Sequence, residues 1–143
     1  MSQFQSFRSY EKFIYTLQQY FPSVKRSSLI LIKRGKHVGQ LRGEMVFGYG
    51  FRVTVNERLS EEDKGVEIIS YGYELWHNTE KIAWYDSQPH PHDPTLASTH
   101  PHHKHVPPNI KRNRIPAPNM SFECPNLPAL MAEIEELIQA IEF

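Results

Sequence analysis

Five short runs of residues alternate between apolar and polar side chains or are rich in β-branched residues, and only short connections separate them. The runs are SSLILIK (27–33), QLRGEMVF (40–47), FRVTVNE (51–57), VEIISYGYELW (66–76) and KIAWYD (81–86). Period-two alternation is typical of β-strands, and such connections are too short for the crossovers that parallel strands require. The Gly-Tyr-Gly tripeptide at 48–50 predicts a hairpin turn, and the charged stretch RLSEEDKG at 58–65 predicts a longer turn. The sequence therefore predicts an antiparallel meander of about five strands.

Apolar residues at helical spacing predict a helix on either side of this meander. The N-terminal stripe consists of Tyr10, Ile14, Leu17 and Phe21. The C-terminal stripe consists of Leu127, Leu130, Met131, Ile134, Leu137, Ile138 and Ile141, with glutamates opposite. The first stripe predicts a helix over about residues 7–20, which Pro22 ends. The second predicts an amphipathic helix that docks on the sheet, so the expected fold class is α+β.

Between the last strand and the C-terminal helix the composition changes abruptly. Ten of the 11 prolines lie between Pro89 and Pro128, and six of the 8 histidines lie in PHPHDPTLASTHPHHKH at 89–105. Regular structure is not expected there, because proline removes backbone donors. We expect one domain over residues 1–143: helix plus sheet (1–88), a Pro/His-rich irregular segment (89–126) and the C-terminal helix (127–143). Because the docked helix holds the far end of this segment, we expect the segment to be ordered.

Composition excludes several classes of protein. No run of about 18 apolar residues exists, so a membrane-spanning helix is not expected. The first residues, MSQFQSFRSYEKF, do not have the pattern of a signal peptide. The single cysteine cannot form an internal disulfide, which favours a cytoplasmic protein. The formal net charge of +0 says nothing about partners, although a basic stretch (100–118) precedes the acidic C-terminal helix.

The histidines offer acid–base chemistry on a phosphodiester. Imidazole titrates near neutral pH, and RNA carries its own nucleophile, the 2′-hydroxyl, so cleavage needs no metal. The catalytic candidates are His90, His102, His103, Lys104 and His105. We expect His103 and His105 to act as acid and base in either order, Lys104 to stabilise the phosphate, and His102 or His90 to orient one of the rings. Lys111, Arg112 and Arg114 then bind neighbouring phosphates.

Two alternatives use the same histidines. His90, His92, His103 and His105, with Asp86 or Asp93, are donors that suit zinc or another divalent transition metal, although their spacing matches no known ligand signature. In the second alternative the rings are structural and hydrogen-bond to backbone carbonyls, which locks the loop against the sheet.

An aromatic cluster lies on the last two predicted strands: Tyr71, Tyr73, Trp76, Trp84 and Tyr85. Such a cluster packs across paired strands more often than it stacks on bases. Within it, we expect Tyr85 to contact RNA.

The stretches SYGYELW (70–76), WYDSQPHPH (84–92) and THPHHKH (99–105) resemble the TumE-like toxins of bacterial toxin–antitoxin systems. The signature positions of that family correspond to His90, His102, His103, Lys104 and His105, with Tyr85 and Asp86 before them. The resemblance covers roughly residues 24–105, and the chain continues beyond it as the extended, cyanobacterial-type variants do. It implies a small cytoplasmic endoribonuclease that pairs with a helix-turn-helix antitoxin.

Residues and resemblance together predict a toxin-like endoribonuclease with RNA and an antitoxin as partners, no membrane association and no cofactor. The acidic C-terminal helix can hold the partner or form a homodimer. The alternative function is a metal-binding or protein-interaction domain in which the histidine segment is structural.

Overall fold

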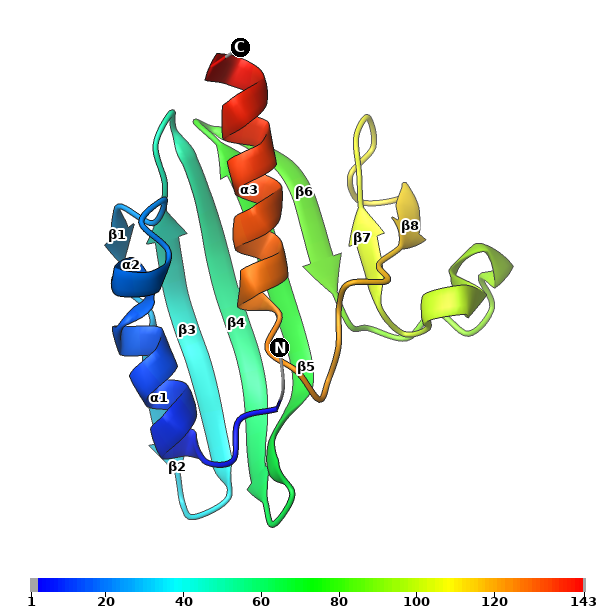
Figure 1. Cartoon of the computed structure of the whole chain (residues 1–143). Helices are drawn as coiled ribbons and strands as arrows, with labels where there is room; N and C mark the ends of the chain where they lie inside the picture. Colours follow the sequence, from blue (N-terminus) through cyan, green and yellow to red (C-terminus); the bar gives the residue numbers. More distant parts are fainter. Residues whose placement is uncertain (1–2, 143) are drawn as a thin grey trace.

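The computed structural model describes residues 3–142 and contains one large antiparallel sheet with helices on one of its faces (Figure 1). The elements are α1 (Phe7–Tyr15), α2 (Leu17–Tyr20), β1 (Arg26–Ser27), β2 (Ile30–Arg34), β3 (Val38–Val46), β4 (Phe51–Glu62), β5 (Gly65–His77), β6 (Glu80–Asp86), the 3₁₀ helix η1 (Pro94–Thr99), β7 (His103–His105), β8 (Arg114–Pro116) and α3 (Leu127–Glu142). The predicted α+β class is confirmed.

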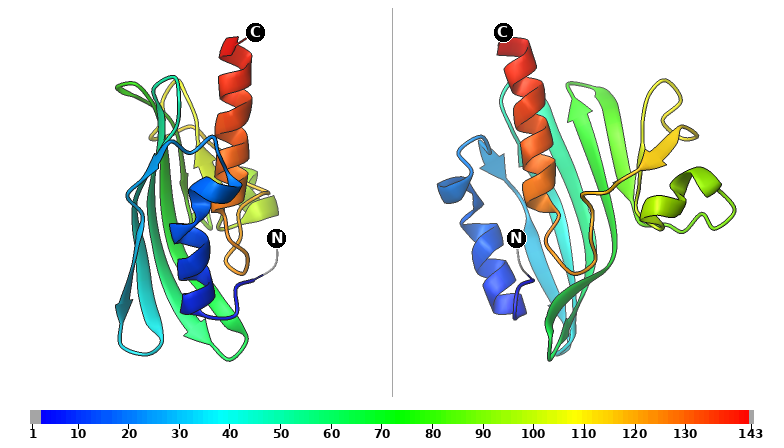
Figure 2. Two further views of the ribbon diagram at one scale, coloured as in Figure 1. Left: turned by 60° about the vertical axis from the view of Figure 1, so that its left-hand side comes forward. Right: turned by 45° about the vertical axis from the view of Figure 1, so that its right-hand side comes forward.

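The sheet has 8 strands in the order β1-β3-β4-β5-β6-β7-β8, and β2 also pairs with β3. Figure 2 shows α1 and α3 on the same face of the sheet, and no helix within residues 3–142 covers the opposite face. We call this second surface the open face. The five predicted strands correspond to β2–β6, and the sheet is larger than expected because β1, β7 and β8 add to it. These three strands are only two or three residues long, so they carry no periodic signal of their own.

The hairpin turns follow the backbone preferences of their residues. Tyr49 and Gly50 both adopt positive φ, of 60° and 80°, as a two-residue turn between twisted strands requires. The stretch at 58–65, in contrast, was wrongly predicted as a long turn. β4 continues to Glu62 and β5 begins at Gly65, because Leu59 is buried and extends the alternating pattern.

The N-terminal helix begins as predicted but is divided in two. The Ser6 side chain accepts a hydrogen bond from the backbone N–H of Ser9, and the Ser9 side chain accepts one from Ser6, which forms a capping box. The Thr16 hydroxyl donates to the carbonyl of Lys12 at 2.7 Å, a local bond that bends helices. The expected single helix over 7–20 is therefore α1 followed by α2.

The Pro/His-rich segment is more regular than expected, since it contains η1, β7 and β8. The Asp93 side chain caps η1 by accepting a hydrogen bond from Thr95 N–H, and Pro94 occupies the start of that helix. β7 pairs with β6, and β8 pairs with β7, so this segment extends the main sheet at its β6 edge.

A buried carboxylate ties the helices to the sheet. Glu57 of β4 is fully buried and accepts hydrogen bonds from Tyr10 of α1, at 2.5 Å, and from Tyr73 of β5. Asn126, just before α3, donates to the Tyr73 hydroxyl at 3.0 Å. Burial raises the pKa of Glu57, and the two tyrosine hydrogen bonds only partly oppose that effect. The core thus contains one polar hub that α1, the sheet and the start of α3 share.

Replacing Glu57 tests this hub. Glu57→Leu leaves two buried hydroxyls without an acceptor, and we expect it to lower the free energy of unfolding by about 1–3 kcal/mol. Because the folded-state pKa is raised, the contribution of Glu57 is largest below its ordinary pKa of 4.5 and declines as pH rises through the window up to the folded value. The glutamine in Glu57→Gln does not titrate, so this variant does not lose free energy of unfolding in that way. Measured by urea unfolding, its stability relative to the natural chain should increase with pH. Parallel pH profiles for the two chains would contradict this account.

Candidate functional site

The pairing of β6 with β7 determines which side chains meet. Asp86, the last residue of β6, lies opposite His103, the first residue of β7, and Trp84 lies opposite His105. Residues opposite one another on antiparallel strands share a face, and neighbours along a strand alternate. His103 and His105 therefore lie on the open face with Asp86, whereas Lys104 lies on the helix face with Tyr85.

Three polar side chains converge at this point. The Nε2 of His103 lies 2.9 Å from Oδ1 of Asp86, and the Nε2 of His105 lies 3.3 Å from Oδ2. The two Nε2 atoms are 3.1 Å apart. All three residues are buried, with His103 at 0 % exposure, His105 at 3 % and Asp86 at 8 %. We call Asp86, His103 and His105 the triad.

Neighbouring groups hold the two rings in place. The Nδ1 of His103 lies 3.0 Å from the carbonyl oxygen of Pro101, and Trp84 stacks on His105 with ring centroids 4.3 Å apart. His90 meets His103 edge-on at 4.7 Å and is itself only half-buried. The Nδ1 of His105 is buried and makes no hydrogen bond among the described residues, although the backbone of Ile110 is close enough to raise the pKa of that ring.

The electrostatics of the triad separate its three pKa values. Burial acts to raise the pKa of Asp86, but hydrogen bonds from His103 and from the backbone of Gln88 lower it below its ordinary value. For His103, burial acts to lower the pKa, but the contacts with Asp86 and Pro101 raise it. Burial lowers the pKa of His105, and the Asp86 charge only partly offsets that effect.

Arg114 adds a fixed cation beside the triad. It lies opposite His105 in the β7–β8 pairing, and its charge acts to lower the pKa of both His90 and His103. Its Nε atom is buried and has no hydrogen-bond partner within residues 3–142. A guanidinium next to two or three imidazoles is suited to binding an anion such as a phosphate.

A groove on the open face leads to the triad. It has a volume of about 630 Å³ and is lined by residues that include Asn56, Arg58, Gly72, Trp84 and Asp86. A second hollow of about 380 Å³ shares Asn56, Gly72 and Trp84 with the first, which makes the depression continuous across the sheet. Nothing lies within 4 Å of the position that a Cβ of Gly72 would occupy. The glycine thus keeps the floor of the groove low, and Asp86 is the point at which groove and triad meet.

The cross-strand register explains this groove. One row of paired residues crosses the five strands from β3 to β7 and ends in the triad: Arg42, Asn56, Gly72, Asp86 and His103. Arg42 and Arg58 are exposed and make no ion pair in the described part of the chain. Single-sequence reasoning missed Asn56, Arg58 and Gly72 because their proximity to Asp86 depends on strand register. Their polar positions in alternating strands were the available signal.

The structure brings together only some of the predicted site residues. His90, His103, His105 and Arg114 lie together with Asp86. His102 lies just outside the triad: its Nδ1 is 2.7 Å from the Tyr71 hydroxyl, and its ring packs on Phe122.

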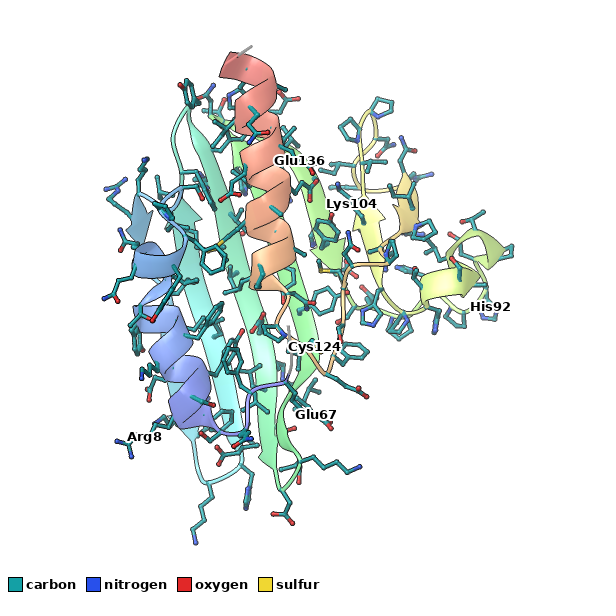
Figure 3. The ribbon with its side chains drawn as sticks, in the orientation of Figure 1. Arg8, Glu67, His92, Lys104, Cys124 and Glu136 are labelled. Carbon is teal, nitrogen blue, oxygen red and sulfur yellow. The ribbon has the colours of Figure 1, made fainter. Side chains whose placement is uncertain are left out.

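The remaining predicted site residues lie apart from the triad. Lys111 and Arg112 are exposed in the turn between β7 and β8, and His92 is exposed in the loop before η1 (Figure 3). Within residues 3–142, His92 makes no hydrogen bond, ion pair or ring contact with the triad. Trp84 lies on the open face, whereas Tyr71 and Tyr73 are buried, so the two faces of the sheet divide the aromatic cluster.

The side chains of Lys104 and Tyr85 lie on the opposite face of the sheet, against α3. Lys104 forms an ion pair with Glu133 of α3, and the Tyr85 hydroxyl donates to the same carboxylate at 2.8 Å. Figure 3 shows Lys104 directed toward α3. Within this geometry the lysine anchors the helix, and the cation that lies beside the imidazoles is Arg114.

A family model described as Toxin TumE matches residues 13–138 of the chain. The chain belongs to the TumE toxin family. The match extends well past residue 105, so it includes the strand β8 and most of α3 of this TumE-family chain. A family of toxins implies an antitoxin partner.

No curated protein and no solved structure matches this TumE-family chain. None of the helices within residues 3–142 is long and apolar enough to cross a membrane.

The separate position of Lys104 can be tested by substitution. Lys104→Met removes a partly buried ion pair, and we expect it to lower the free energy of unfolding by about 1 kcal/mol or less. The imidazole NMR signals of His103 and His105 should not move, because the lysine lies on the other face. Lys111→Met, at an exposed turn position, is the matched control and should change neither quantity. Displaced His103 and His105 signals in Lys104→Met would place the lysine next to the triad after all.

Proposed function

We propose that this TumE-family chain is an endoribonuclease toxin, and that the triad at the end of the open-face groove is its cleavage centre. The observation that carries this proposal is the convergence of two imidazoles, a carboxylate and an arginine where the open-face groove ends. Buried titratable groups that meet at a groove are typical of active sites.

The groove has the chemistry that single-stranded RNA requires. Arg42 and Arg58 are exposed cations without an ion pair among residues 3–142 and can contact successive phosphates, and Asn56 offers an exposed amide. Trp84 presents a half-buried ring to the groove, and Lys81 lies 5.1 Å from the centroid of that ring. Aromatic faces of this kind stack on bases without strong sequence preference. The open face is therefore the proposed RNA surface.

RNA suits this centre better than DNA because its 2′-hydroxyl is an internal nucleophile. Attack on the adjacent phosphorus needs a group that takes the 2′ proton, a group that protonates the leaving 5′ oxygen, and a cation for the phosphorane. Imidazoles at the triad and His90 can exchange these protons, and Arg114 can carry the phosphate charge. The role that the sequence suggested for Lys104 thus passes to Arg114, since Lys104 faces α3.

The proposed partners are RNA on the open face and a helix-turn-helix antitoxin, in a cytoplasmic toxin–antitoxin pair. The exposed side of α3 is the proposed antitoxin surface, because it combines Glu136 with the exposed apolar residue Ile141. A second copy of the chain is the alternative occupant of this side.

The primary experiment is cleavage of total RNA by the purified chain, with chelator and, separately, with added divalent ions. A His103→Ala, His105→Ala double variant should lose about 100-fold or more of the activity. His92→Ala is the matched control, because it removes a histidine of the same segment that lies apart from the triad. Absence of cleavage by the natural chain in every condition would overturn the proposal, as would full activity in the double variant.

Filling the groove tests the proposed RNA surface without replacing a triad residue. Gly72→Leu places a side chain in empty space on the groove floor, so the fold should persist while RNA affinity falls about tenfold or more, which corresponds to ~1.4 kcal/mol. Gly48→Leu introduces the same side chain at a turn where space is also open, and it should leave affinity unchanged. Fluorescence anisotropy with a labelled single strand measures both. Equal affinity of the two variants would exclude this groove as the RNA surface.

A further inference from the structure

The atoms of the triad that face one another are all able to donate a lone pair. The Nε2 of His103 lies 2.9 Å from Oδ1 of Asp86, the Nε2 of His105 lies 3.3 Å from Oδ2, and the two nitrogens are 3.1 Å apart. Such atoms repel one another in a buried site unless a positive charge lies between them. A proton on one ring satisfies one contact at a time, whereas a metal ion satisfies all three.

The surroundings of His103 leave a lone pair on its Nε2 that can bind a ligand. Its Nδ1 lies 3.0 Å from the Pro101 carbonyl oxygen, which can only accept, so the Nδ1 carries the proton. In the neutral tautomer the Nε2 then presents its lone pair to the triad. Metal-binding histidines almost always donate their second N–H in this way to a carbonyl or a carboxylate.

His105 is arranged similarly. Its Nε2 also points toward Asp86, and Trp84 covers one face of the ring. Its Nδ1 is buried on the side away from Asp86. With the proton on Nδ1, this ring too presents a lone pair at Nε2. Both imidazoles therefore aim their Nε2 atoms at one point beside the carboxylate.

The spacing agrees with a tetrahedral ion. Ligand atoms at about 2.0–2.1 Å from a zinc ion lie roughly 3.3 Å apart from one another. The two nitrogens are 3.1 Å apart, and each lies 2.9 or 3.3 Å from its nearer Asp86 oxygen, so these contacts are within a few tenths of an ångström of that spacing. Asp86, His103 and His105 also form a group whose ligand atoms all lie within 4.8 Å of one another.

From this geometry we infer that Asp86, His103 and His105 form a binding site for a divalent transition-metal ion of the zinc class. Two imidazoles and one carboxylate suit Zn²⁺, Fe²⁺, Mn²⁺ or Ni²⁺ better than Mg²⁺ or Ca²⁺, which prefer oxygen ligands alone. Three protein ligands leave an open coordination position, as in catalytic rather than structural zinc sites.

This site deepens the proposed function, and its catalytic role rests on that function. A bound ion can polarise a phosphate oxygen at the end of the groove, where Asp86 lies. His103 and His105 then act as ligands, and His90, the half-buried ring beside His103, is the imidazole that remains for proton transfer. The metal-free route expected from the sequence is replaced by a metal-assisted one.

The test is metal binding by the full-length chain, measured without RNA. After treatment with chelator and its removal, the chain is titrated with Zn²⁺ by calorimetry and with Co²⁺ by visible absorption, which reports tetrahedral coordination. We expect one ion per chain, and about 100-fold weaker binding or more in Asp86→Asn and in His103→Ala. His92→Ala, His100→Ala and His102→Ala are the controls for adventitious binding by the histidine-rich segment, and circular dichroism verifies that every variant is folded.

The outcomes separate this inference from the proposed function. Stoichiometric binding that depends on the triad supports the site, even if no RNA is cleaved. Binding that survives in Asp86→Asn and His103→Ala, or that is lost equally in His92→Ala, overturns it as adventitious. Cleavage of RNA in excess chelator by a chain without bound metal overturns the catalytic role of the ion, while the endoribonuclease function would stand.

Discussion

The pairing of three residues of β7 with the end of β6 organises most of what is distinctive in this protein. The register places Asp86 opposite His103 and Trp84 opposite His105, so a carboxylate and two imidazoles share one small buried space. The same strand directs Lys104 to the other face, where it binds Glu133 of α3. One short strand therefore assembles the candidate site and also holds the C-terminal helix, and a shift of its register by one residue would exchange the two sets of side chains.

Two buried carboxylates in this sheet illustrate the difference between a structural and a chemical environment. Glu57 is surrounded by tyrosine hydroxyls that do not titrate near neutral pH, and burial raises its pKa. Asp86 is surrounded by imidazoles, and its pKa is lowered although burial acts in the opposite direction. Glu57 lies under the helices, and Asp86 lies at a groove on the open face. The first arrangement stabilises the fold, and the second places titratable groups at a groove, which the proposed function and the proposed metal site both use.

Much of the fold could be predicted from local pattern. The stripes of α1 and α3, the five central strands and the hairpin at 48–50 each follow from residues close together in sequence. The errors occurred where local pattern is weak or misleading. The charged stretch at 58–65 was predicted as a turn although Leu59 continues the alternation, and β7 and β8 are too short to show a period. The resemblance ended near residue 105, whereas the family match continues to residue 138.

The sequence by itself determined the family and the α+β class, because these depend on composition, periodicity and short motifs. Only the tertiary structure decided which histidines of the Pro/His-rich segment lie together. His92 and Lys104 are as close in sequence to the triad as its own members, yet one lies in an exposed loop and the other faces α3. The reason is physical: strand alternation and cross-strand register determine which side chains meet, and both depend on pairings between residues far apart in the chain.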